Sequence, residues 1–110
     1  MEIGIVFPVL PGKSESLAEF AGKLMTERKA EYEQSQVSIT KESWWIQPTP
    51  IGDFCIVYFV ADDPMAVFSN LGTSMEPFDV WFRQQVQENT GIDLKVPPPG
   101  MPRQIFDWTR

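Results

Sequence analysis

The carboxyl group of Glu42 is our first candidate for acid–base chemistry in this sequence. Glu42 and Trp44 are two residues apart in a stretch with the alternation of a strand, so both project from one face. A carboxyl group beside an indole in an apolar site has a raised pKa and can act as a general acid or base. The alternative is an exposed glutamate at a sheet edge, next to a tryptophan that serves packing alone.

Arg28 and Tyr32 follow Leu24 at intervals of four residues, which places all three on one stripe of a predicted helix. An arginine at the mouth of a pocket binds anions through its planar guanidinium. The plainer interpretation, which we favour, is an ion pair with Glu31 or Glu42 and a stem that lies over apolar surface. Tyr32 is a second, lesser candidate for the chemistry.

Aromatic side chains are abundant, with four tryptophans, two tyrosines and eight phenylalanines. Trp44, Tyr58 and Trp81 are the ones we expect to line an apolar pocket, the usual form of a site for a small ligand. Aromatic residues at helix or strand spacing also form cores, and that remains the alternative for each of them. Asp79 falls in the first turn of a predicted helix, where the helix dipole alone accounts for its charge.

Histidine is absent from the sequence. Its absence removes the commonest general base, the Ser-His and Cys-His nucleophile pairs, His-ligated haem and most transition-metal sites. The glycine-rich nucleotide motifs, the CxxC motif, the GxSxG motif and EF-hand spacing are also missing. We therefore expect no metal and no cofactor.

The net charge of -6 makes nucleic acid a poor candidate for a partner, because an acidic surface repels phosphates.

Cys55 is the only cysteine, so no intrachain disulfide forms, which favours a reducing, cytoplasmic location. Within its apolar run, Cys55 is predicted to be a small buried hydrophobic residue. No run approaches the ~18 apolar residues of a membrane span, and the N-terminal residues predict a strand rather than a signal peptide.

The pattern of apolar residues predicts one α+β domain over residues 1–110. A change of phase in the second strand predicts a β-bulge near residues 41–43. Asp63 and Pro64 are typical of a helix start, and Gly91 of a helix end. The order β-α-β-β-α-β indicates a ferredoxin-like, four-stranded antiparallel sheet with helices on one face. The predicted strands are residues 2–10, 37–47, 53–61 and 104–108; the predicted helices are residues 14–35, 64–72 and about 74–90.

The strand over residues 53–61 is apolar on both faces. Phe54, Ile56, Tyr58 and Val60 alternate with four residues of the opposite face, among them Cys55. Helices on one side cover only one of these faces, and a large exposed apolar face marks an interaction site. We expect a homodimer formed through the sheet, with a C-terminal segment folded back over the sheet as the alternative.

With these elements in place, the chain resembles the dimeric α+β barrel superfamily, and within it a group of uncharacterised bacterial proteins. The resemblance covers nearly the whole chain and indicates fold more than function. The segments that show the resemblance are Arg28 with Glu31-Tyr32, the strand Glu42–Ile46, the run Phe54–Ala61 followed by Asp62-Asp63-Pro64, and residues 76–83 and 90–93.

The resemblance implies a pocket between the sheet and the helices of each subunit. It further implies a cofactor-independent monooxygenase or an isomerase acting on a small aromatic or anionic molecule, in which Trp44, Tyr32 and Arg28 take part. The alternatives are a module that binds a small ligand without catalysis and a protein-interaction domain, because fold alone does not determine function.

Overall fold

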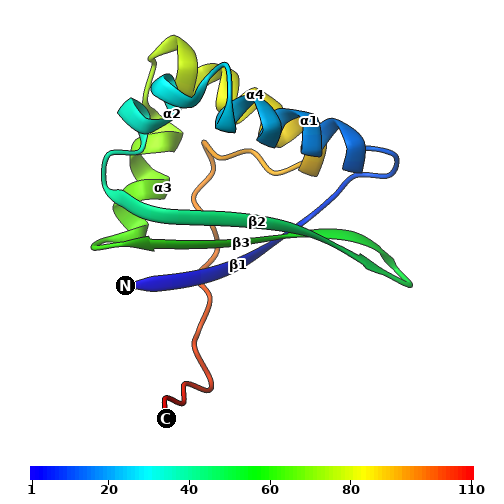
Figure 1. Ribbon diagram of the computed structural model, residues 1–110, viewed down its shortest axis with the longest axis vertical. Helices are drawn as coiled ribbons and strands as arrows, with labels where there is room; N and C mark the ends of the chain where they lie inside the picture. The colour runs from blue at the N-terminus through cyan, green and yellow to red at the C-terminus, as the bar shows by residue number, and fades with distance from the viewer.

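Helices cover one face of an antiparallel sheet in the computed structural model, which describes residues 1–110 (Figure 1). The predicted α+β class is confirmed, but the sheet has three strands and not the four of the predicted arrangement. None of the four helices is both long and apolar enough to cross a membrane. The elements are β1 (Glu2–Pro8), α1 (Ser14–Met25), α2 (Lys29–Ser35), β2 (Ile39–Thr49), β3 (Gly52–Ala61), α3 (Pro64–Thr73) and α4 (Pro77–Thr90).

The central strand is β3, which pairs antiparallel with β1 on one side and β2 on the other. The predicted bulge is present in β2, slightly earlier than expected, between Ile39 and Lys41. Beyond the bulge Glu42 lies opposite Phe59, while Ile39 lies opposite Ala61. Because directly paired residues share a face, the extra residue places Ile39 and Glu42 on the helix-covered face although they are three positions apart.

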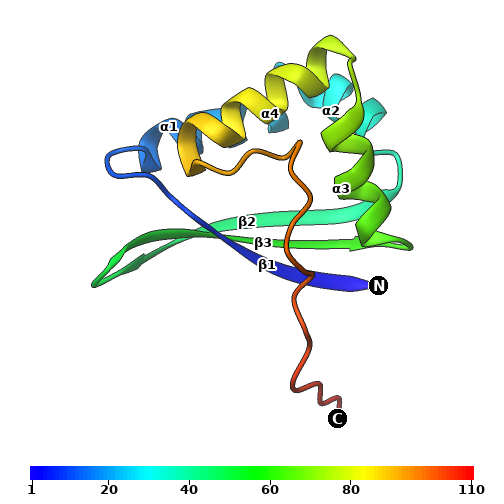
Figure 2. The same ribbon diagram turned by 180° about the vertical axis from the view of Figure 1, so that it is seen from behind.

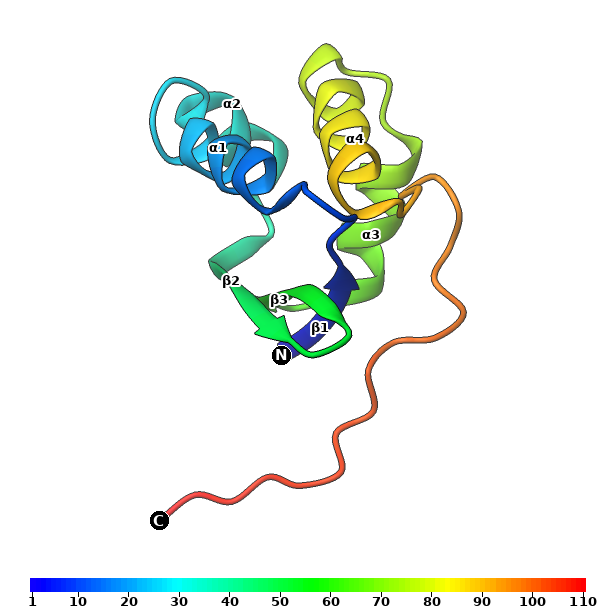
Figure 3. The ribbon, with the colours of Figure 1, turned by 90° about the vertical axis from the view of Figure 1, so that its right-hand side faces the viewer.

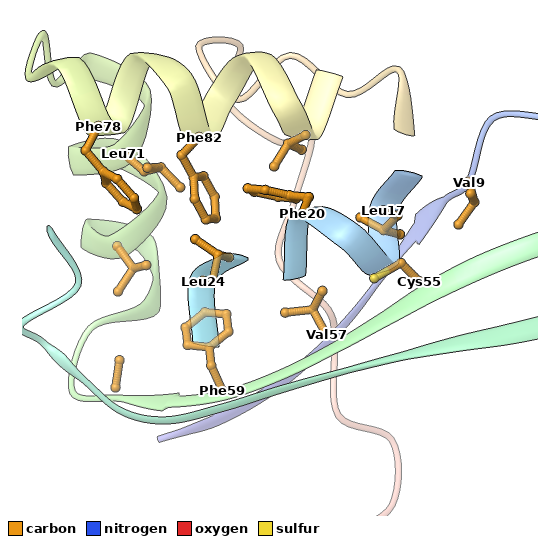
Figure 4. Close-up of a cluster of buried hydrophobic side chains, with 13 residues drawn as sticks. Val9, Leu17, Phe20, Leu24, Cys55, Val57, Phe59, Leu71, Phe78 and Phe82 are labelled. Carbon is orange, nitrogen blue, oxygen red and sulfur yellow. The ribbon is translucent and has the colours of Figure 1, made fainter. Parts of the chain in front are cut away.

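The core forms between the inner face of the sheet and the helices, as Figure 4 shows. Cys55, Val57 and Phe59 point inward from β3 against Phe20 of α1 and Phe82 of α4. Each buried side chain of the size of Val or Phe contributes about 1.5–3 kcal/mol, so this layer supplies most of the driving force for folding. The prediction that Cys55 is a buried hydrophobic residue is confirmed.

The single helix predicted over residues 14–35 is wrong, because the chain breaks between α1 and α2. The Thr26 hydroxyl donates to the Gly22 carbonyl at 2.8 Å, and the Arg28 amide donates to the Lys23 carbonyl at 2.8 Å, one residue further back than in an α-helix. This wider turn changes the direction of the chain, and α2 then packs against α4.

The predicted start of α3 and the predicted end of α4 are confirmed. The Asp63 side chain accepts a hydrogen bond from the Ala66 amide at 3.2 Å, with Pro64 in the first turn of α3. Gly91 ends α4 in the left-handed conformation with φ of 76°, which glycine adopts without strain. The last helix begins at Pro77, three residues later than expected.

The strand predicted over residues 104–108 does not form. Instead, the proline-rich residues 96–102 lie beside Ile5, Val6 and Phe7 of β1, where a fourth strand would pair. Proline has no amide hydrogen to donate, so this stretch cannot extend the hydrogen-bond ladder. The chain then continues past the sheet, and its C-terminus lies beyond the face opposite the helices (Figures 2 and 3).

Candidate functional site

Glu42, Tyr32 and Trp44 form a hydrogen-bonded cluster between β2 and α2. The Tyr32 hydroxyl donates to Glu42 Oε1, and Trp44 Nε1 donates to Glu42 Oε2 at 2.7 Å. The Glu42 side chain is half-buried overall, and its carboxyl group is the more buried part. Both carboxyl oxygens therefore have a neutral donor, and no cation pairs with them.

Burial raises the pKa of Glu42 above that of an ordinary glutamate, because desolvation disfavours the charged form. The hydrogen bonds from Tyr32 and Trp44 act in the opposite direction and limit the shift. Burial also raises the pKa of Tyr32, to which the charge of Glu42 adds. Tyr32 is thus a permanent hydrogen-bond donor, whereas Glu42 is the group of the cluster that can gain or lose a proton.

Three hollows meet at Glu42. An apolar cavity of about 50 Å³ lies in the core behind it, bounded in part by Phe20 and Phe82. A cleft of about 390 Å³ opens between α1 and β2, and a second one of about 290 Å³ opens between α2 and the start of β2. Tyr32 borders both clefts. Since ligand sites commonly have volumes of ~300–1,000 Å³, only the clefts have room for a small organic molecule.

Arg28 lies outside these three hollows and faces another of the aromatic candidates, Trp81. Its guanidinium pairs with Glu31, with Nε 2.9 Å from Oε1, and its central carbon lies 4.0 Å from the centroid of the Trp81 ring. The hydrogen bond from Arg28 lowers the pKa of Glu31. The ion pair that the sequence allowed is present, and the charge of Arg28 is directed at α2 and α4 rather than at Glu42.

Tyr58 lies on the opposite face of the sheet from the cluster. It is aligned with Gly4 of β1 and Ser43 of β2, and its hydroxyl donates to Glu2 Oε2 at 2.8 Å. The structure therefore brings Tyr32, Glu42 and Trp44 together, and it separates Tyr58, Arg28 and Trp81 from them.

A second polar cluster, which the sequence did not reveal, fixes the position of α2. Asp79 is only 7% exposed and accepts hydrogen bonds from the hydroxyls of Ser35 in α2 and Ser74 in the α3–α4 connection. Arg83 donates to the Leu71 and Ser74 carbonyls at 2.8 and 2.6 Å. The Ser35–Asp79 bond joins α2 to α4 and so helps to hold Tyr32 within reach of Glu42, whereas the Arg83 bonds join α4 to α3 and to the connection between them. Nothing in the sequence indicated the bond to Ser35, because the position of Asp79 at a helix start already accounted for its charge.

No group of three or more His, Cys, Asp or Glu side chains is arranged to hold a metal ion. No protein-family model, curated protein or solved structure matches this chain.

Proposed function

We propose that this chain binds a small aromatic molecule in the cleft between α1 and β2, and that Glu42 transfers a proton to or from it. The observation that supports this most directly is the carboxyl group at the meeting point of three hollows, with a raised pKa and no cation beside it. A carboxyl group with a raised pKa that faces a cleft is a candidate for general acid–base catalysis.

The reaction that these residues support is proton abstraction, with isomerisation as its simplest outcome. The Glu42 carboxylate takes a proton from a C–H or O–H bond of the substrate, and the bonding pair moves into the substrate's π system. The same carboxyl group then returns the proton at another atom, so nothing else is consumed. In a cofactor-independent monooxygenase, the deprotonated substrate would react with dioxygen as an additional substrate.

The chemistry of the cleft favours an aromatic ligand over an anionic one. Six of its eight bordering residues are hydrophobic, among them Trp44, Trp45 and Leu24. Arg28, the cation expected to hold an anion, pairs with Glu31 and borders none of the hollows at Glu42. An anion beside Glu42 would also meet the charge of the carboxylate, which a neutral ring does not.

A binding module without catalysis is the second candidate. Both oxygens of Glu42 already have internal donors, so the cluster is satisfied with no ligand present. In that case the Glu42 carboxyl group would shape the cleft rather than move a proton.

A nitrobenzisoxazole separates the two candidates, because this small aromatic ring opens to a coloured phenolate when a base removes its one acidic C–H proton. We expect the wild-type chain to accelerate the opening, with a rate that rises with pH as Glu42 ionises, and Glu42→Gln to lose the acceleration. Glu19→Gln is the matched control, because Glu19 is an exposed carboxylate on α1. Binding of the probe without acceleration would refute proton transfer and leave the binding module.

We also infer that two chains pair through the outer faces of their sheets, as in the dimeric α+β barrel proteins that the sequence resembles. A row of apolar residues crosses this face, where Val6, Ile56 and Trp45 are aligned on three neighbouring strands. Val6 and Trp45 are 58% and 54% exposed in the single chain. Sedimentation equilibrium should give a dimer for the wild type and a monomer for Ile56→Asp. Val37→Asp, on an exposed residue outside the strands, should leave the dimer intact.

A further inference from the structure

The last eight residues form an extended arm that packs against nothing in its own chain. Residues 103–110, here called the C-terminal arm, contain Ile105, Phe106 and Trp108, which are 84%, 80% and 61% exposed. The arm lies beyond the sheet on the side opposite the helices, and Figures 1–3 agree on its direction. Three large apolar side chains on one short segment are typical of a segment that docks elsewhere.

The β1 edge of the same chain is flanked by the proline-rich segment that precedes the arm. Residues 96–102 run along the flank of β1, across a hollow of about 620 Å³ that they border together with Ile5, Val6 and Phe7. A second copy of the chain carries the same segment along its own β1. The other edge strand, β2, pairs only with β3, so its outer edge is the open one.

The backbone groups on that open edge belong to the candidate site. Met1 exchanges hydrogen bonds with Ala61, and the Val9 amide donates to the Asp53 carbonyl, so odd-numbered residues of β3 direct their backbone groups toward β1. Even-numbered residues of β3 then bond odd-numbered residues of β2, following the alternation of an antiparallel ladder. Glu42, Trp44 and Ile46 consequently direct their amides to the open edge.

We propose that the C-terminal arm of one copy crosses to a second copy and pairs with the open edge of its β2. The cleft beside Glu42 would then be closed by residues of the partner, and by twofold symmetry each copy would complete the site of the other. The role of the arm in completing the site rests on the proposed function, whereas the pairing of the arm with β2 does not.

The length and charge of the arm fit this exchange. Eight extended residues reach about 26 Å at ~3.3 Å per residue, while packed sheets lie ~10 Å apart. The arm can therefore cross the interface and still run along several residues of a strand. Its side chains include Arg103 and Arg110 against Asp107, one cationic side chain in excess, while the chain as a whole has a net charge of -6.

Amide hydrogen exchange tests the pairing directly. An isotope-labelled chain that ends at Pro102 should exchange the amides of Glu42, Trp44 and Ile46 at least tenfold faster than the full-length chain. Adding unlabelled full-length chain should restore their protection in the labelled chain, which has no arm of its own. Because the arm packs on nothing in its own chain, the shortened chain should fold, and circular dichroism checks this.

A full-length variant with Ile105→Ser and Phe106→Ser provides a second test that does not shorten the chain. It should lose the same protection, whereas Thr109→Ala should keep it. Three results would overturn the proposal: fast exchange at these amides in the full-length chain, protection that is equal in a monomer, or protection lost at β1 instead of β2. The Glu42→Gln variant should keep the exchange pattern, so a failure of proton transfer and a failure of the arm are distinguishable.

Discussion

Replacing Tyr32 by phenylalanine removes one hydroxyl and leaves the ring, which stacks on Phe82 with centroids 6.4 Å apart. The loss is therefore confined to the hydrogen bond that Glu42 Oε1 accepts. A buried acceptor left without a partner costs about 1–3 kcal/mol in the free energy of unfolding. For a domain of about this size, each kcal/mol lowers the melting temperature by roughly 4–8 °C.

The destabilisation by Tyr32→Phe should grow with pH. Burial raises the folded-state pKa of Glu42 above the unfolded value, so this group contributes stability below the unfolded pKa, and that contribution is lost as pH rises through the folded pKa. The Tyr32 hydroxyl favours the ionised form, and its removal raises the folded pKa of Glu42 further. Each added pKa unit deepens the loss at high pH by about 1.4 kcal/mol.

Urea unfolding followed by tryptophan fluorescence at a series of pH values measures this effect. The matched control is Thr73→Val, which also removes one hydroxyl, here from an exposed bond to the Ser69 carbonyl at the end of α3. That variant should change the free energy of unfolding by no more than about 0.5 kcal/mol. Equal losses in the two variants, or a loss for Tyr32→Phe that is the same at every pH, would refute the reasoning.

Four further predictions concern the fold. Gly72→Ala should destabilise by about 1–3 kcal/mol in thermal melts, because an added Cβ would lie 2.5 Å from the Leu94 carbonyl oxygen. Gly22→Ala, with no atom within 4 Å of its Cβ, should instead stabilise α1 by up to about 1 kcal/mol. Asp63→Ala should cost about 1 kcal/mol in urea unfolding through loss of the α3 cap. Burial raises the pKa of Cys55 to about 11, so a thiol reagent at neutral pH should label it only as fast as the chain unfolds.

The parts of the fold that follow from short-range patterns could be predicted from the sequence. The alternating runs gave the three strands, and Asp63-Pro64 and Gly91 marked helix ends through backbone rules that act over a few residues. The missing fourth strand could not be predicted, because residues 104–108 have a strand-like composition. Their failure to pair depends on where the preceding prolines lie relative to β1.

Only part of the candidate site could be predicted from the sequence. Glu42 and Trp44 share a strand face by simple alternation, so their proximity follows from spacing alone. Tyr32 comes from a different element, and its contact with Glu42 depends on the direction that α2 takes after the break. The directions of Arg28 and Tyr58 depend in the same way on their neighbours Glu31, Trp81 and Glu2.

Two departures from regular structure create the site. Without the bulge between Ile39 and Lys41, the start of β2 and Glu42 could not both face the helices. Without the break after Met25, α1 would continue straight, and Tyr32 would not turn to meet the carboxyl group. Neither irregularity contains a proline or a glycine, so each must be held in place by what packs around it, which for α2 includes the Ser35–Asp79 bond. Irregularities that local sequence does not demand are expected at functional sites, and here both position the same hydrogen bond.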